Sequence, residues 1–446
     1  MIDALGQVWK AHPARRGCYL AVLGLMGWSA TAAAGPLPDA KADLSAFMRA
    51  AAVFACRMDP ADSAGVRAAV PGGRLLEFDI LNIRGQPGRS IHRLLMPAGG
   101  ELVMRRLFPL GRLRRVSVEY HERGTAGEAR PLMAATADHT CKVFEGRRLA
   151  YDGDGQAGRL SVLASDLETV ISTEPLNPPV PAGTDPGGPL VALVDSGVNY
   201  TLDGIKARLA RDAEGNLVGF DFWDRDRRPY DVDASRSAFF PLHHGSAVAS
   251  ILLGEAPTAR LAVYRYPRPD MSRMAALVAD ADKAGAVIVN LAMGSNRAED
   301  WSAFADAARA RPHMLFVVSA GNNGRDIDRG PVYPASLPLD NLLVVTSADA
   351  FGRLARGSNW GAEAVDLMVP GEQLAVTDHR GAEGRASGSS FAVPRVAALA
   401  ARLLAANPVW KAPELKAAIL KRARRPQGDI ANRLRHGWIP DPADDF

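Results

Sequence analysis

The chain has 446 residues, 47% of them hydrophobic and 23% charged, so it can bury at least one large core. Its formal net charge of +4 is small for this length and gives no reason to expect a nucleic-acid partner. The densest basic stretch, RRLFPLGRLRR at 105–115, interleaves aliphatic residues with arginines. That pattern predicts a strand or hairpin with one solvated face, and a binding patch is the alternative.

The N-terminus has the features of an export signal. A basic region containing Lys10, Arg15 and Arg16 precedes an apolar run at 18–28 that is too short for an ordinary transmembrane span. Small residues follow and predict cleavage after Ala34. An uncleaved N-terminal anchor is the alternative. Since no later stretch reads as long and apolar enough to cross a bilayer, we expect an exported protein, periplasmic or extracellular, without a stable membrane span after signal removal.

Two of the three cysteines lie beyond this signal, which contains Cys18. The remaining pair, Cys56 and Cys141, predicts one disulfide, because an even number of cysteines in an exported protein usually forms a disulfide framework. Such a bond would close a long loop in the N-terminal region. The alternative is two unrelated buried thiols, since spacing alone does not fix the geometry that a disulfide needs.

A Pro/Gly-rich run at 173–189 divides the chain and predicts a linker. Before it we expect a signal peptide at 1–34 and a domain at 35–172. After it we expect a second domain at 190–446. The upstream domain contains one helical pattern at 42–58, followed by short alternating runs that are typical of strands. We therefore expect it to be a smaller α+β or β-rich domain.

The downstream domain alternates short apolar runs with amphipathic patterns. The apolar runs, which are typical of buried parallel strands, lie at 190–194, 261–266, 286–290, 314–318 and 342–346. Helical patterns separate several of them, so we predict an α/β domain of three layers whose mostly parallel central sheet is covered on both faces. In such sheets the chemistry gathers at the carboxyl ends of the strands.

Two residues that could act as an acid and a base stand at such positions. Asp195 directly follows the run at 190–194, where a buried carboxylate is costly unless it has a partner. His244 stands at the start of an amphipathic helix, and that end of a helix lowers the pKa of an imidazole, which suits a general base. Its neighbour His243 competes for the role. Taken singly, each residue has an ordinary alternative as a turn residue or a structural histidine.

A nucleophile and a hydrogen-bond donor complete the set. Ser389 and Ser390 begin an apolar helix whose free N–H groups point toward them, although helix capping is the alternative role. Asn322 follows the run at 314–318, and its amide could donate to a developing negative charge or serve only in a turn. The order Asp, His, Ser is that of the subtilisin triad and differs from the chymotrypsin and α/β-hydrolase orders.

With these residues in this order, the sequence resembles the subtilisin-like serine proteases, or subtilases, over about residues 186–425. The stretches VALVDSGVN, HHGSAVASILLG and SGSSFAVPRV resemble the aspartate, histidine and serine motifs of that family. The resemblance implies that Asp195 orients the base, that His244 rather than His243 is the base, and that Ser390 is the nucleophile. Ser389 takes the place where the family usually has threonine.

The resemblance also implies an oxyanion donor and a substrate-binding region. SAGNNG resembles the oxyanion segment and makes Asn322 the side-chain donor. The residues that would contact substrate are Ala292, Met293, Gly294, Ser295, Ala320, Gly321 and Val332. Ala292 stands where the family often has serine, and we expect little effect. Val332 stands where many relatives have a small residue at the base of the main specificity pocket, so we expect a preference for small or medium P1 side chains.

One acidic loop, FDFWDRDRRPYDVD at 220–233, contains carboxylates that could bind a metal ion. Some relatives bind calcium in this region, but arginines dilute the negative charge here and no EF-hand spacing is present. We expect a solvated loop, with calcium as the alternative, and we expect no required metal or cofactor.

The sequence therefore predicts an exported serine endopeptidase acting on protein or peptide substrates. Its N-terminal domain is expected to be a propeptide or regulatory domain, an intramolecular inhibitor or chaperone, with a retained accessory domain as the alternative. A catalytically silent or masked subtilase-fold binding protein remains the alternative for the whole chain. An esterase would need the order Ser, Asp, His and a G-x-S-x-G elbow, which G-S-S-F-A does not fit.

Overall fold

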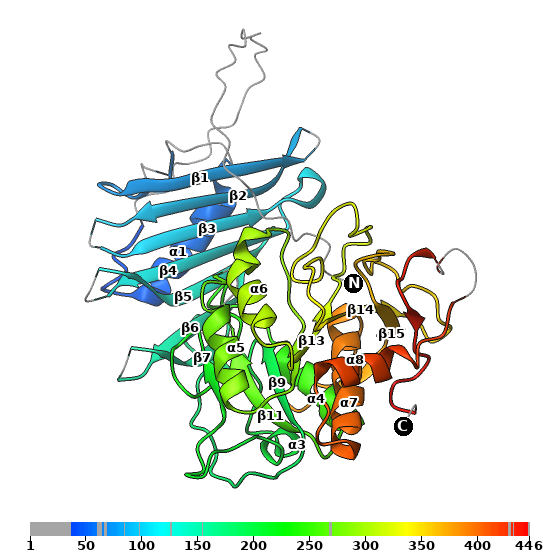
Figure 1. Cartoon of the computed structure of the whole chain (residues 1–446). Coiled ribbons are helices and arrows are strands. Elements are labelled where there is room, and N and C mark those ends of the chain that lie inside the picture. Colours follow the sequence, from blue (N-terminus) through cyan, green and yellow to red (C-terminus); the bar gives the residue numbers. More distant parts are fainter. Residues whose placement is uncertain are drawn as a thin grey trace. The chain divides into compact units, whose positions relative to one another are not determined.

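The computed structural model describes residues 37–444 except for 60–64, 67–68, 84, 98, 125–126, 154, 267–269, 427–429 and 431. The predicted export signal and its cleavage site lie outside the described residues. The chain forms two compact units (Figure 1). The first contains the described residues up to Gly146 together with Leu163–Thr169, and the second contains Arg147–Val162 and the chain from Val170 onward.

The first unit packs one helix against antiparallel strands. Helix α1 (Leu44–Arg57) begins after Asp43, whose carboxylate accepts a hydrogen bond from the Ala46 N–H at 2.8 Å, an ordinary N-terminal cap. The strands, each paired with the next, are β1 (Arg74–Ile83), β2 (Gln86–Leu95), β3 (Glu101–Leu107), β4 (Arg115–Arg123) and β5 (Ala129–Asp138). The apolar face of α1 and the strand residues facing it form one core. The expected β-rich N-terminal region is confirmed.

Three further strands follow: β6 (Val143–Tyr151), β7 (Ala157–Leu163) and β8 (Val170–Pro175). Most of β6 and β7 and the whole of β8 belong to the second unit. Within the first unit, Cys56 near the end of α1 and Cys141 after β5 form a disulfide, with their Cα atoms 5.5 Å apart. The structure therefore brings together the two cysteines that the sequence pairs.

The basic stretch at 105–115 forms the β3–β4 hairpin, with a short 3-10 turn η1 (Pro109–Gly111) at its tip. One of its arginines departs from the expected solvated face. Arg106 is only 2% exposed and donates to Ser90 Oγ at 2.9 Å and to the Met58 carbonyl at 2.7 Å. Because both partners lie far from the hairpin in sequence, alternation alone could not place this guanidinium in the interior.

His92 on β2 is a second buried polar residue of the first unit. Its ring lies 4.8 Å from the Phe78 ring, and neither ring nitrogen has a hydrogen-bond partner among the described residues. Burial, assisted by the positive charge of Arg106, lowers the pKa of His92 from 6.5 to about 4. The folded chain therefore holds this imidazole neutral.

We expect the first unit to lose stability in mild acid because of His92. Above about pH 6.5 the neutral imidazole carries no protonation cost, but between pH 6.5 and 4 the unfolded chain binds a proton that the folded chain does not, removing up to about 3 kcal/mol. Thermal unfolding of the wild type and of His92→Leu from pH 7.5 to 4.5 measures this. The variant should show a shallower fall in Tm, whereas the control His139→Leu, at an exposed site, should not. Identical slopes for all three proteins would contradict the assignment.

The second unit contains a parallel central sheet. In spatial order its strands are β10 (Gly219–Asp221), β11 (Arg260–Arg265), β9 (Leu190–Asp195), β12 (Ile288–Leu291), β13 (Leu315–Ser319), β14 (Leu342–Ala348), β15 (Leu367–Pro370) and β18 (Gly437–Trp438). Each neighbouring pair is parallel. The continuous apolar runs of the central strands are buried on both faces, as parallel sheets require. The predicted α/β fold is confirmed.

Helices cover both faces of this sheet, with α5 and α6 on one side and α4 and α7 on the other (Figure 1). The helices are α3 (Asp203–Lys206), α4 (Gly245–Glu255), α5 (Met274–Lys283), the 3-10 turn η2 (Glu299–Trp301), α6 (Ser302–Arg309), α7 (Ser389–Ala406) and α8 (Ala412–Leu420). A hairpin of β16 (Leu374–Thr377) and β17 (Glu383–Ala386) precedes α7.

Helix α7 corrects one expectation from the sequence. By length and apolar composition it could cross a membrane, but 72% of it is buried inside the folded chain. Its apolar side chains pack on β12, β13 and β14 and on helix α4. The helix is apolar because it forms the centre of one layer of the fold.

The Pro/Gly-rich run at 173–189 is bound along the second unit. The Tyr200 hydroxyl donates to the Pro178 carbonyl, and Arg211 donates to the Pro181 carbonyl at 2.6 Å. Asp185 accepts from the Arg211 backbone at 3.1 Å. Proline keeps this backbone extended and leaves its carbonyls able to accept hydrogen bonds. The sequence predicts a linker here, and in the structure the segment is hydrogen-bonded to the second unit.

Candidate active site

Asp195 and His244 meet at the carboxyl end of the central sheet. Asp195 ends β9, and His244 directly precedes α4. His244 Nδ1 lies 2.7 Å from Asp195 Oδ1 and 2.9 Å from Oδ2. The Asp195 carboxylate is buried and the imidazole is partly exposed. A carboxylate in this position favours the tautomer with a proton on Nδ1, which leaves Nε2 able to accept one.

A second buried carboxylate, Asp231, holds His244 in place. Asp231 accepts from the backbone N–H of His244 at 3.0 Å, from that of Ser246 at 2.9 Å, and from the Ser196 hydroxyl at 2.6 Å. The Ser196 oxygen in turn accepts from the Gly245 N–H at 2.9 Å. A negative group at the first turn of α4 satisfies N–H groups that have no partner inside the helix.

We expect Asp231→Ala to destabilise the chain and to reduce any activity that depends on His244. The change removes the acceptor of the Ser246 N–H and the shorter of the two acceptors of the Ser196 hydroxyl and of the His244 N–H, which should cost about 1–3 kcal/mol. Thermal unfolding compared with Asp203→Ala, an exposed carboxylate on α3, measures the effect. Equal Tm values for the two variants would show that Asp231 does not hold the start of α4.

Two adjacent serines begin α7 in different environments. Ser389 is fully buried, and its Oγ contacts Ser319 Oγ at 2.7 Å and Asn322 Oδ1 at 2.9 Å. Ser390 is partly exposed, and its Oγ lies 3.5 Å from the Ala292 carbonyl oxygen. Of the two hydroxyls, the one on Ser390 is therefore open to a substrate.

The position of Asn322 beside these serines explains how its amide is oriented. Asn322 Oδ1 accepts from both the N–H and the hydroxyl of Ser389, each at 2.9 Å, so the Nδ2 group faces away from Ser389 and keeps its protons for another acceptor. Gly388 permits this approach, because its φ of 137° suits only glycine and an added Cβ would lie 3.4 Å from the amide. The sequence marks Ser389 only as a neighbour of Ser390 and carries no signal for this orienting contact.

His244 also lies near the start of α7. The His244 ring is 5.2 Å from the ring of Phe391, the residue after Ser390, and helices α4 and α7 pack together. This packing places His244 next to the first turn of α7, which contains Ser390.

The segment expected to bind substrate lies between β12 and the Tyr333 loop. Ala292, Met293 and Ala320 are buried at the strand ends. Ser295 pairs its own backbone with Tyr333, with both N–H to O distances at 2.8 Å. The Ser295 backbone is therefore engaged with Tyr333, and its contact with substrate stays a prediction.

Val332 lies beside the segments that carry Gly294 and Gly321. It is 5% exposed, and its Cγ1 would be 3.5 Å from a Cβ added to Gly294 and 3.8 Å from one added to Gly321. Its side chain therefore fills space between the two glycine-bearing segments.

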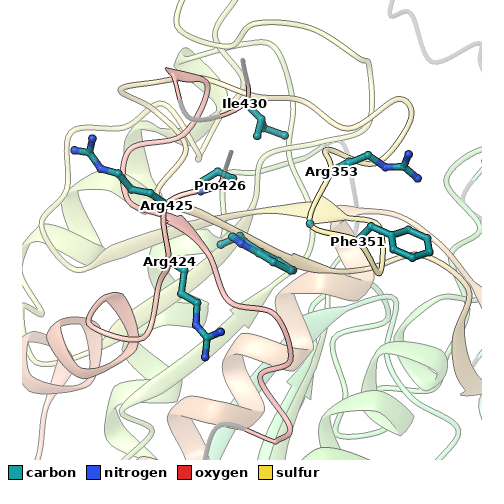
Figure 2. A pocket seen from close by; sticks show the side chains of 8 residues that line it. Phe351, Arg353, Arg424, Arg425, Pro426 and Ile430 are labelled. Carbon is teal, nitrogen blue, oxygen red and sulfur yellow. The ribbon is translucent and has the colours of Figure 1, made fainter. Parts of the chain in front are cut away.

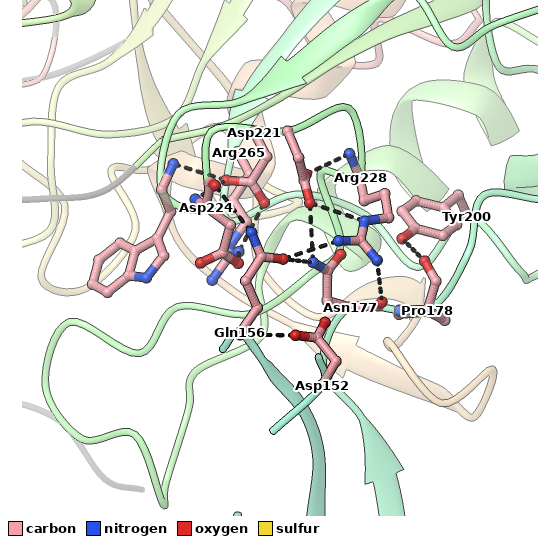
Figure 3. A network of polar contacts seen from close by, with 11 residues as sticks. Asp152, Gln156, Asn177, Pro178, Tyr200, Asp221, Asp224, Arg228 and Arg265 are labelled. Carbon is pink, nitrogen blue, oxygen red and sulfur yellow. Dashed lines mark hydrogen bonds and ion pairs between the residues drawn. The ribbon is translucent and has the colours of Figure 1, made fainter. Parts of the chain in front are cut away.

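The acidic loop at 220–233 is not the solvated loop that the sequence predicts. Arg265, itself buried, donates to Asp221 at 2.8 Å and to Asp224 at 2.5 Å, while Arg228 contacts Asp226 at 2.9 Å (Figure 3). Burial raises the pKa of Asp221 to about 6 although Arg265 opposes the shift. The carboxylates of the loop are therefore paired with arginines, one from β11 and one from the loop itself.

A separate open pocket of about 570 Å³ lies in the second unit. It is lined by Phe351, Gly352, Arg353, Arg424, Arg425, Pro426, Ile430 and Trp438. The three labelled guanidinium groups point in different directions and do not converge on one point (Figure 2). None of the candidate catalytic residues lines this pocket, so we place the candidate site at the strand ends described above.

Known proteins resemble the second unit of this chain. The model of the subtilase family matches residues 187–438, more than half of the chain. A thermophilic serine proteinase of Bacillus sp. (strain AK1) is 30% identical over 231 residues, which cover 48% of this chain and 52% of that protein. A cell wall-associated protease of Bacillus subtilis (strain 168) is 26% identical, with 58% and 28% covered.

Subtilisin E of Bacillus subtilis (strain 168) is 24% identical over 230 residues, which cover 49% of this chain and 56% of that protein. The chain thus spans about half the length, or less, of these curated relatives. The family match over more than half of the chain, on a parallel sheet with this strand order, decides the family. The chain belongs to the subtilase family.

Proposed function

We propose that this protein is an exported serine endopeptidase that hydrolyses peptide bonds with Asp195, His244 and Ser390. The observation that carries the proposal is the contact of His244 Nδ1 with the buried Asp195 carboxylate, at 2.7 Å, next to α7, whose first turn contains Ser390. Family membership adds to it, because the four motif residues stand in the family's order.

The proposed reaction follows from these groups. Ser390 Oγ attacks the carbonyl carbon of the scissile bond while its proton passes to His244 Nε2, and Asp195 stabilises the resulting imidazolium. The Ser390 N–H and the Asn322 Nδ2 group donate to the oxyanion. His244 then gives its proton to the leaving amine. A water molecule, activated by the same imidazole, hydrolyses the acyl-enzyme and frees Ser390.

Hydrolysis of casein and of a simple nitrophenyl ester by the purified secreted protein tests this proposal. We expect casein to be degraded to peptides. Ester hydrolysis without casein degradation would indicate an esterase. No hydrolysis of either by protein that unfolds cooperatively would indicate the silent, binding form of the fold.

Export is supported by the signal-like N-terminus and by the Cys56–Cys141 disulfide, since disulfides persist in oxidising compartments. We further propose that the N-terminal region is a propeptide or regulatory domain, which supplies an intramolecular inhibitor or chaperone. Intact-mass analysis of the secreted protein decides between processing and a retained accessory domain. An N-terminus near Asp185 would support processing, and one near residue 35 would support retention.

We expect Val332→Gly to shift specificity toward large P1 side chains. Removing the isopropyl group from between the segments that carry Gly294 and Gly321 lengthens the proposed pocket, and each buried methylene group is worth about 10- to 200-fold in discrimination. The ratio of kcat/KM for phenylalanine and alanine at P1, measured on matched peptides, should rise at least about tenfold. An unchanged ratio would remove Val332 from the pocket base.

A further inference from the structure

Three side chains that the proposed mechanism does not use converge beside the candidate base. Glu174 comes from β8, His243 from the loop before α4, and His379 from the turn between β16 and β17. Glu174 Oε1 lies 2.9 Å from His243 Nε2 and 3.2 Å from His379 Nε2, and the three atoms all lie within 4.8 Å of one another. The side chains are only 17%, 11% and 11% exposed.

Direct hydrogen bonds do not fully account for this cluster. Among the described residues, neither Glu174 Oε1 nor His379 Nε2 has a partner in hydrogen-bond alignment, despite the short distances. A buried polar atom left in this state costs about 1–3 kcal/mol. A cation that accepts an electron pair from each of the three atoms would remove that cost.

The tautomer of His243 also leaves an electron pair available to such a group. His243 Nδ1 is within hydrogen-bonding distance of the Asp231 carbonyl oxygen, and a carbonyl can only accept, so Nδ1 carries a proton. Nε2 is then the atom that faces Glu174. Histidines that bind metals are commonly held in this manner, with the other ring nitrogen donating to a backbone carbonyl.

We propose that Glu174, His243 and His379 bind one divalent transition-metal ion of the zinc class, through a carboxylate oxygen and two Nε2 atoms. Two imidazoles and a carboxylate suit zinc, whereas calcium takes six to eight oxygen ligands. Bonds of about 2.0–2.1 Å in a tetrahedron place ligand atoms about 3.3 Å apart, close to the separations of the cluster.

Binding requires one local adjustment. The His243 and His379 rings stack with centroids 3.5 Å apart and planes 10° from parallel, so they must tilt for both lone pairs to meet at one ion. His379 is anchored through its carbonyl, which accepts from Asn199 Nδ2 at 2.7 Å, so a tilt of its ring requires a change only in its side-chain torsions. A bound ion would join β8, the loop before α4 and the β16–β17 turn.

Metal binding can be measured without catalysis, on full-length Ser390→Ala purified without a histidine tag. After removal of metal by a chelator, the protein is dialysed against Zn²⁺ and its metal content is measured. We expect about one Zn²⁺ per chain, a higher Tm with Zn²⁺ than with Ca²⁺, and visible absorption by Co²⁺ bound in place of Zn²⁺.

Variants locate the ion. Glu174→Gln and His379→Gln, made in the same background, should each weaken Zn²⁺ binding at least about tenfold, whereas His139→Gln, at an exposed histidine outside the cluster, should not. Failure to retain Zn²⁺, equal retention by all variants, or tighter binding of Ca²⁺ would each overturn the proposal. If a variant does not fold, nitrogen ligation read from the cobalt or copper spectrum of the parent decides, and an all-oxygen signature rejects the site.

Discussion

Replacing Ser390 with alanine is expected to lower kcat by about 10⁶-fold, the size of the loss measured when subtilisin loses its own nucleophile. The reason is chemical: alanine has no oxygen to attack the carbonyl, and His244 then has no proton to take. Steady-state kinetics on a fluorogenic peptide measures the loss. The variant should fold with wild-type Tm, because Ser390 is partly exposed and the contact of its Oγ with the Ala292 carbonyl is long, at 3.5 Å.

The adjacent serine supplies the matched control. Ser389→Thr keeps the hydroxyl that contacts Ser319 and Asn322, and we expect most activity to survive. The Ser389 side chain is fully buried, so the added methyl group must find room, and Tm should be measured alongside kcat. Loss of all activity in a well-folded Ser389→Thr, with activity retained in Ser390→Ala, would reverse the assignment of the two serines.

Replacing Asn322 with alanine is expected to lower kcat by about 10²–10³-fold with little change in KM, since an oxyanion donor acts mainly in the transition state. This magnitude, too, is the one measured for the equivalent change in subtilisin. The truncation also removes the acceptor of the N–H and hydroxyl of buried Ser389, so Tm should fall modestly and is measured alongside kcat. Rate measurements at saturating and at low substrate concentration separate kcat from KM.

Two control variants distinguish loss of the oxyanion donor from disturbance of the loop that carries it. Asn323→Ala removes an exposed neighbouring amide and should leave kcat unchanged. Ser389→Ala removes the hydroxyl contact to Asn322 Oδ1 but leaves the backbone N–H contact, so its effect should be smaller than that of Asn322→Ala. If Asn323→Ala were as damaging as Asn322→Ala, the loss would reflect the loop and not the oxyanion donor.

The fold of the second unit could be predicted because its signals are local. Continuous apolar runs mark β9, β11, β12, β13 and β14, and the structure places a strand at each. What the sequence could not provide were partners from distant segments. Arg106 is buried because Ser90 and the Met58 carbonyl receive it. The acidic loop is ordered because Arg265 arrives from β11.

In the candidate site, too, some residues could be predicted from local sequence and others could not. The four motif residues Asp195, His244, Asn322 and Ser390 each stand next to a strand or helix end, so residue type and position together identify them. The residues that hold them carry no such signal. Asp231 reads as one carboxylate among several in the acidic loop, and only the folded chain places it at the start of α4.

The proposed metal-binding cluster is the part of the structure that is hardest to predict from the sequence. Glu174 lies in a stretch that the sequence assigns to a linker, His243 reads only as a rival of His244, and His379 stands in a hairpin turn. No spacing rule connects three residues so far apart in the chain. The pairing of Ser295 with Tyr333 is hidden for the same reason, because it joins two loops through their backbones.

Labelling with a fluorophosphonate probe tests the central claim most directly. The tryptic peptide 386–395 contains both candidate serines, so fragmentation between Ser389 and Ser390 locates the adduct. We expect one adduct per chain on Ser390, with loss of casein hydrolysis in proportion to labelling and no labelling of Ser390→Ala. An adduct on Ser389, or full casein hydrolysis by labelled protein, would contradict it.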